Sequence, residues 1–113
     1  MLQISEEKRG HALILCLKGR LDPATAQSAL DRLASCVDRD EHRLALDCSA
    51  LDYVSSAGLR VVLMISKRVT KLEGRLVLFG LSQPTRRIFD LVGFTSILGI
   101  YDSAEAAIEA LLA

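Results

Sequence analysis

The sequence has 113 residues, which suits one compact domain and leaves little room for a second. Half of the residues are hydrophobic and a quarter are charged, so a core and a polar surface can both form. Fourteen basic residues balance fourteen acidic ones, so no net charge attracts nucleic acid or an anionic membrane. No apolar segment has the length of a membrane span, and the N-terminus lacks the apolar region of a signal peptide.

The chain opens with two strand-like segments joined by a glycine turn. Residues 3–8 alternate weakly between apolar and polar, and residues 11–18 form an apolar run, which predicts an antiparallel hairpin. Asp22 and Pro23 are typical of a helix start, with Asp22 as the N-cap and proline at the first helical position. Apolar residues then recur at helical spacing to about residue 38.

The middle of the chain predicts a strand, a short loop and a second helix. The strand covers residues 43–47, and the helix runs over about residues 56–72, with Ser56 as its N-cap. Leu72 is expected on the buried face of this helix, and Gly74 is expected to end it.

The last third predicts two further strands and two further helices. A strand over residues 75–79 precedes a helix capped by Ser82, and a strand over residues 97–101 precedes a helix capped by Asp102. The element order is therefore β-β-α-β-α-β-α-β-α. It predicts an α/β fold with a mixed, mostly parallel sheet of four or five strands flanked by about four helices.

The residues that could carry chemistry do not form a known catalytic or metal-binding pattern. The three cysteines, Cys16, Cys36 and Cys48, lack C-x-x-C spacing, and the chain has two histidines, so we expect neither a metal nor a cofactor. Free thiols indicate a cytoplasmic protein. Phosphate-binding glycine loops, a G-x-S-x-G elbow and an H-E-x-x-H helix are absent, so we expect no enzyme activity.

A receiver-like phosphorylation domain is an alternative interpretation of the βα alternation. Asp47, at the end of a predicted strand, would then be the phosphate acceptor. The sequence lacks the adjacent acidic pair that would hold magnesium, and the last predicted strand lacks a lysine. These absences disfavour that function.

Three segments, in the same order along the chain, carry a resemblance to a known family. They are GRLD at residues 19–22, LDCSALDYVSSAGL at residues 46–59, and the C-terminal pattern over residues 83–94 and 98–107. Together they resemble the STAS domain, specifically the stand-alone bacterial anti-sigma-factor antagonists. The resemblance implies that residues 1–113 form a single STAS domain.

The family resemblance implies partner switching rather than catalysis. The unphosphorylated antagonist binds an anti-sigma factor that is also a serine kinase, and the sigma factor is released. The kinase phosphorylates a serine at the start of the second helix, which ends binding, and a PP2C-type phosphatase resets the cycle. A STAS module that serves a client other than a sigma-factor pathway is the alternative within the family.

The family signature commonly reads Asp-Ser-Ser/Thr-Gly-Leu, whereas this chain has SSAGL at residues 55–59. We expect Ser56 to be the phosphorylated residue because it aligns with a family hydroxyl, with Ser55 as the second choice. Arg60 and Met64 share one face of the second helix and suit a partner surface. The residues expected to bind the partner are Asp22, Ser55, Ser56, Gly58, Arg60 and Met64.

Overall fold

The computed structural model describes residues 1–113 and contains the predicted elements in the predicted order. The strands are β1 (Leu2–Arg9), β2 (Ala12–Leu21), β3 (Arg43–Val54), β4 (Arg75–Phe79) and β5 (Gly99–Tyr101). The helices are α1 (Ala26–Asp38), α2 (Ser56–Lys71), α3 (Gln83–Leu91) and α4 (Ala104–Leu112), with a 3-10 turn, η1 (Phe94–Ser96), before β5. The predicted α/β class and element order are confirmed.

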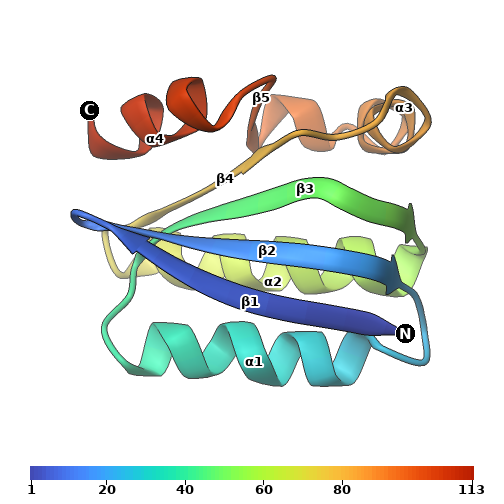
Figure 1. The fold of residues 1–113 in the computed structure, drawn as a ribbon, viewed down its shortest axis with the longest axis horizontal. Coiled ribbons are helices and arrows are strands. Elements are labelled where there is room, and N and C mark those ends of the chain that lie inside the picture. The colour runs from blue at the N-terminus through green and yellow to red at the C-terminus, as the bar shows by residue number, and fades with distance from the viewer.

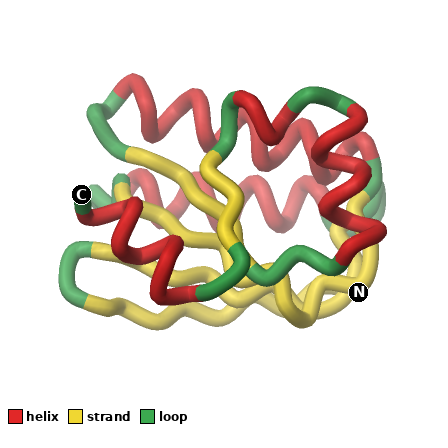
Figure 2. The backbone as a smooth tube through the Cα atoms, turned by 90° about the horizontal axis from the view of Figure 1, so that it is seen from above, coloured by secondary structure: helices red, strands yellow, loops and turns green.

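The five strands form one mixed sheet in the order β1-β2-β3-β4-β5. The pair β1–β2 is antiparallel, and the other three pairs are parallel. Helices α1 and α2 run side by side on one side of strands β1 to β3, and α4 lies on the other side (Figure 1). Figure 2 shows α4 in front of the strands, with α1 and α2 behind them. None of the helices has the length and apolarity needed to span a bilayer.

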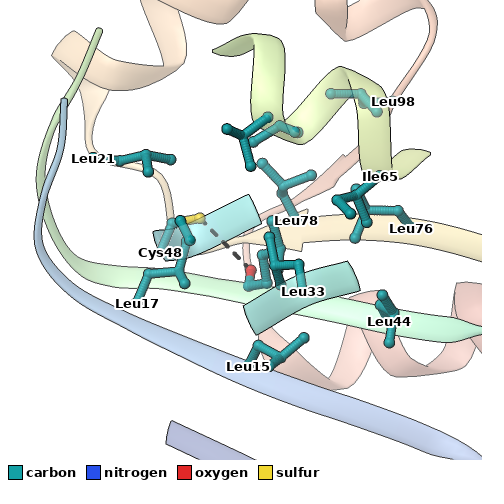
Figure 3. Close-up of a cluster of buried hydrophobic side chains, with 14 of the residues drawn as sticks. Leu15, Leu17, Leu21, Leu33, Leu44, Cys48, Ile65, Leu76, Leu78 and Leu98 are labelled. Atoms are coloured by element: carbon teal, nitrogen blue, oxygen red, sulfur yellow. Dashed lines mark hydrogen bonds between the residues drawn. The ribbon is translucent and has the colours of Figure 1, made fainter. Parts of the chain in front are cut away.

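Both faces of β2 are buried, which explains its continuous apolar sequence. Leu13, Leu15 and Leu17 point into the larger core toward α1 and α2, while Ala12 and Ile14 belong to the smaller core under α4. Figure 3 shows the centre of the larger core, which gathers leucine side chains from β2, β3 and β4 around Leu33 of α1 and Ile65 of α2.

Strand β3 is longer than the sequence predicts. The prediction ended the strand at Asp47 and placed a loop after it, but β3 continues to Val54. Its pairing with β2 shifts register at two points, so the alternation of buried and exposed residues is interrupted. Cys48 and Leu51 are buried in this extension. Because of the extension, β2 and β3 end side by side, with Leu21 opposite Val54.

Two features at the end of α2 differ from the prediction. Leu72 lies just beyond the helix and is 46% exposed rather than buried. The left-handed backbone is at Glu73, with a φ of 62°, and not at Gly74. Glycine is required at position 74 for another reason, because a Cβ there would lie 2.1 Å from the carbonyl oxygen of His42.

The start of α4 also differs from the prediction. Ser103 is the N-cap, and its hydroxyl accepts a hydrogen bond from the Ala106 amide at 3.2 Å. Asp102 therefore does not cap this helix. The predicted cap of α3 is confirmed, since the Ser82 hydroxyl accepts from the Thr85 amide at 3.3 Å.

Glu6 joins the hairpin to α1 through two arginines. Its carboxylate accepts hydrogen bonds from Arg39 Nη2 at 2.8 Å and from Arg32 Nε at 3.1 Å. The hydrogen bond from Arg39 is the largest influence on the pKa of Glu6; partial burial opposes it, and Arg32 adds to it. The pKa of Glu6 is therefore lower than its ordinary value.

This arrangement predicts an acid-sensitive contribution to stability. A carboxyl whose pKa is lower in the folded chain stabilises the fold above its unfolded pKa, and this contribution is lost as the pH falls through the folded pKa. We expect Glu6→Gln to reduce the free energy of unfolding at pH 7 by up to about 1 kcal/mol, and by less at pH 3. Urea denaturation at both pH values measures this. Glu109→Gln, which removes an exposed carboxylate without an ion pair, is the control.

Candidate functional site

The candidate residues lie at the end of the sheet where β2 and β3 finish and where α1 and α2 begin (Figure 1, right). The amide of Ser55 donates a hydrogen bond to the carbonyl oxygen of Leu21 at 2.9 Å. This bond holds the start of α2 against the end of β2. The sequence-predicted Asp22 and Ser56 are thereby placed on the same end of the molecule.

Ser55, and not Ser56, is the N-cap of α2. Ser55 has extended backbone angles, with φ −92° and ψ 174°, and its hydroxyl accepts a hydrogen bond from the Gly58 amide at 3.3 Å. The prediction that Ser56 caps the helix is wrong because β3 runs to Val54, so that Ser55 occupies the last extended position. Ser55 is 9% exposed, whereas Ser56 is exposed and its hydroxyl makes no hydrogen bond within the chain.

The two serines should therefore differ in their effect on stability. Ser55→Ala removes the cap and leaves the Gly58 amide without a partner, so we expect a loss of about 1 kcal/mol. Ser56→Ala removes an exposed hydroxyl and should change the free energy of unfolding by less than about 0.5 kcal/mol. Urea denaturation of both variants checks this, and equal losses would contradict the assignment of Ser55 as the cap.

Gly58 allows α2 to approach β2 closely. A Cβ at this position would lie 2.7 Å from Leu21 Cγ and 2.8 Å from the Leu21 carbonyl oxygen. That oxygen already accepts the hydrogen bond from Ser55. Gly58 is buried, so it contributes by letting α2 pack against Leu21 and does not offer a surface to a partner.

Asp22 stabilises the turn before α1 but is not the N-cap of that helix. The helix begins at Ala26, with Thr25 in the cap position. Asp22 Oδ1 accepts hydrogen bonds from the amides of Ala24 at 3.0 Å and Thr25 at 3.1 Å, which is an Asx-type turn. The pattern of aspartate before proline thus stabilises a turn that precedes the helix.

The hydrogen bonds of this turn keep Asp22 ionised. Desolvation raises the pKa of Asp22, but the hydrogen bonds from Thr25, Ala24 and Arg20 together outweigh it and leave the pKa below its ordinary value. The Thr25 hydroxyl also donates to the carbonyl oxygen of Arg20 at 2.8 Å, which ties the turn to the end of β2.

Arg20 and Tyr53 form a contact that sequence reasoning missed. The guanidinium carbon of Arg20 lies 4.4 Å from the centre of the Tyr53 ring, a cation–π geometry, and Arg20 Nε lies 3.5 Å from Asp22 Oδ2. The two residues are register partners on β2 and β3. They become neighbours only because β3 extends past its predicted end, so local sequence carries no signal for the pair.

A shallow groove between α1 and α2 begins beside the start of α2. Its lining is Ala26, Gln27 and Leu30 from α1, and Ala57, Arg60, Val61 and Met64 from α2. Arg60 is the only charged residue in this lining, and it forms no ion pair within the chain. Met64 is 47% exposed. The structure thus places the predicted partner residues Arg60 and Met64 in one apolar groove near Ser56.

The structure does not support Asp47 as a phosphate acceptor. Asp47 Oδ1 accepts hydrogen bonds from the amide of Ser49 at 3.0 Å and from its hydroxyl at 2.5 Å, and Oδ2 lies 3.5 Å from the Cys16 sulfur. The residue lies within β3 rather than at its end. No cluster of histidine, cysteine or acidic side chains is arranged to hold a metal ion.

The three cysteines are free and make no reactive centre. Burial is the main cause that raises the pKa of the Cys16, Cys36 and Cys48 thiols, so all three are held as thiols near neutral pH.

Comparison with known proteins identifies the family. The STAS domain matches residues 3–107 of this chain. The chain belongs to the STAS domain family. It is 42% identical over 106 residues to BtrV of Bordetella bronchiseptica, which is named as an anti-sigma factor antagonist; the match covers 94% of this chain and 91% of BtrV. The resemblance drawn from the three sequence segments is therefore confirmed.

Solved structures of STAS proteins share the fold. An anti-sigma factor antagonist from Mycobacterium paratuberculosis has a TM-score of 0.92 at 20% identity, covering 100% of this chain and 96% of that one. The Bacillus protein SpoIIAA in its phosphorylated form has a TM-score of 0.72 at 18% identity, covering 97% of this chain and 98% of that one. Anti-sigma factor antagonists are binding proteins, so these relatives confirm the prediction that this STAS protein is not an enzyme.

Proposed function

We propose that this STAS protein is an anti-sigma-factor antagonist whose binding is ended by phosphorylation of Ser56. The observation that carries the proposal is the exposed Ser56 hydroxyl at the start of α2, beside the groove lined by Ala57, Arg60 and Met64. A partner seated in this groove would cover the start of the helix. The relative BtrV is named as an anti-sigma factor antagonist, and SpoIIAA is known in a phosphorylated form.

The geometry favours Ser56 over Ser55 as the phosphate acceptor. The Ser55 hydroxyl is buried and occupied by the Gly58 amide, so a kinase would have to break the helix cap to reach it. The Ser56 hydroxyl is free and exposed. A phosphate there would lie near the positive end of the helix dipole and could be added without disturbing the fold.

Phosphorylation would end binding through charge. The modification adds close to two negative charges at neutral pH. In a docked interface that charge must be desolvated, or it must take away a cation that the bound protein would otherwise contact. Either effect lowers the stability of the complex by several kcal/mol, as an order of magnitude. The switch therefore acts on the partner and leaves the fold unchanged.

The proposal implies two partner proteins and one cellular location. An anti-sigma factor with serine kinase activity would bind the unphosphorylated chain and modify Ser56. A PP2C-type phosphatase would remove the phosphate. The free thiols suit the reducing cytoplasm, where both enzymes would meet this protein.

Phosphopeptide mass spectrometry on the protein isolated from its native cells tests this function. We expect a phosphate on Ser56 in the wild-type chain and none at this position in Ser56→Ala. A phosphate on Ser55 would contradict the choice of acceptor. If neither serine is modified across growth and stress conditions, the switch is wrong, and a STAS scaffold for another client becomes the better interpretation.

A further inference from the structure

We propose that the Arg60 guanidinium binds the phosphate on phosphorylated Ser56 within the same chain. This contact draws the only positive charge of the lining away from the groove between α1 and α2. The inference rests on the proposed phosphorylation of Ser56 and adds a residue that acts on the phosphate. Both residues belong to α2 and are exposed.

The helix places the two side chains on one face. Ser56 and Arg60 are separated by four positions, which is one turn of an α-helix, and residues at this spacing are neighbours on the helix surface. A phosphate offers three acceptor oxygens, and a guanidinium offers donors arranged to bind two of them. An arginine four residues after a phosphoserine is therefore within reach of it.

Arg60 is also uncommitted in the unphosphorylated chain. Arg32 on α1 and Arg39 just after this helix pair with Glu6, and Arg68 on α2 pairs with Asp38. Arg60 has no such partner, and the α1 side of its groove offers Gln27, which donates to Asp31. No carboxylate competes for the guanidinium from the groove lining.

The pair changes the groove in two ways at once. Phosphorylation adds negative charge at the groove entrance, and the phosphate then draws the Arg60 guanidinium toward itself. A partner carboxylate that contacts Arg60 in the unphosphorylated complex would lose that contact. The switch is therefore a competition between two anions for one arginine.

The test installs phosphoserine at position 56 during synthesis, so it does not depend on a kinase. Phosphorus NMR across pH 4–8 measures the second pKa of the phosphate, which is ordinarily about 6. We expect this pKa to be lower by about half a pH unit in the wild-type chain than in Arg60→Gln. Arg60→Lys should keep part of the difference, because it keeps the charge but not the two-pronged geometry.

Lys67→Gln is the matched control, because it removes the same charge from the same helix two turns farther on. In this variant the second pKa of the phosphate on Ser56 should equal that of the wild-type chain. Equal pKa values in wild type and Arg60→Gln would overturn the proposal, as would an equal change in Lys67→Gln. Failure to find phosphate on Ser56 in cells would instead refute the proposed function, and the two results can be told apart.

Discussion

Replacing Ser56 with aspartate is expected to abolish binding of the anti-sigma factor while the fold remains intact. The substitution places a permanent negative charge at the entrance of the apolar groove, where it would have to be desolvated or would compete with the partner for Arg60, the one charged residue of the lining. We expect at least a hundredfold rise in Kd, which corresponds to about 2.7 kcal/mol or more. Isothermal titration calorimetry with the anti-sigma factor captured by the wild-type chain measures this effect.

The control for this prediction is Ser35→Asp. Ser35 is exposed on α1 and does not line the groove, so an aspartate there adds the same charge away from the groove. Its Kd should stay within a few-fold of the wild type. If both aspartate variants weaken binding equally, total charge rather than position controls the complex, and the switch at Ser56 is refuted.

Gly58→Ala is expected to be the most damaging single-methyl change at the site. The added Cβ would overlap both the side chain and the carbonyl oxygen of Leu21, which also receives the Ser55 amide. Relief requires α2 to move away from the end of β2, and we expect a loss of about 1–3 kcal/mol in the free energy of unfolding. This loss occurs although alanine is the better helix former.

Urea denaturation measures the Gly58→Ala effect, with Ser56→Ala as the control. The control changes the neighbouring exposed position without adding an atom against β2. An alanine at position 58 that leaves stability unchanged would show that the first turn of α2 shifts freely, and the close contact would then not define the site.

Much of this fold could be predicted from consecutive residues. The apolar run of β2, the helical spacing over α1 and α2, and the serine cap of α3 are local patterns. The structure contains all four elements, although α1 begins at Ala26 rather than directly after Asp22. The family signature also lies in one continuous segment. These features depend on neighbours in the chain, which a sequence displays directly.

The details of the candidate site depended on contacts between distant segments. Strand β3 continues past two register shifts against β2 to Val54, so Ser55 caps α2 and Ser56 is free. The same register sets Arg20 against Tyr53. The two register shifts interrupt the period-two pattern on which strand prediction relies, so a prediction from the sequence alone ends the strand too early.

The sequence by itself therefore determined the α/β class, the element order and the family, because periodicity and signature residues are written along the chain. Only the tertiary structure decided which serine is exposed, why Gly58 has no room for a side chain, and that Arg60 is the lone charge of a groove. These properties arise from how α2 packs against β2 and α1. That packing depends on contacts between residues far apart in the chain, which no local pattern encodes.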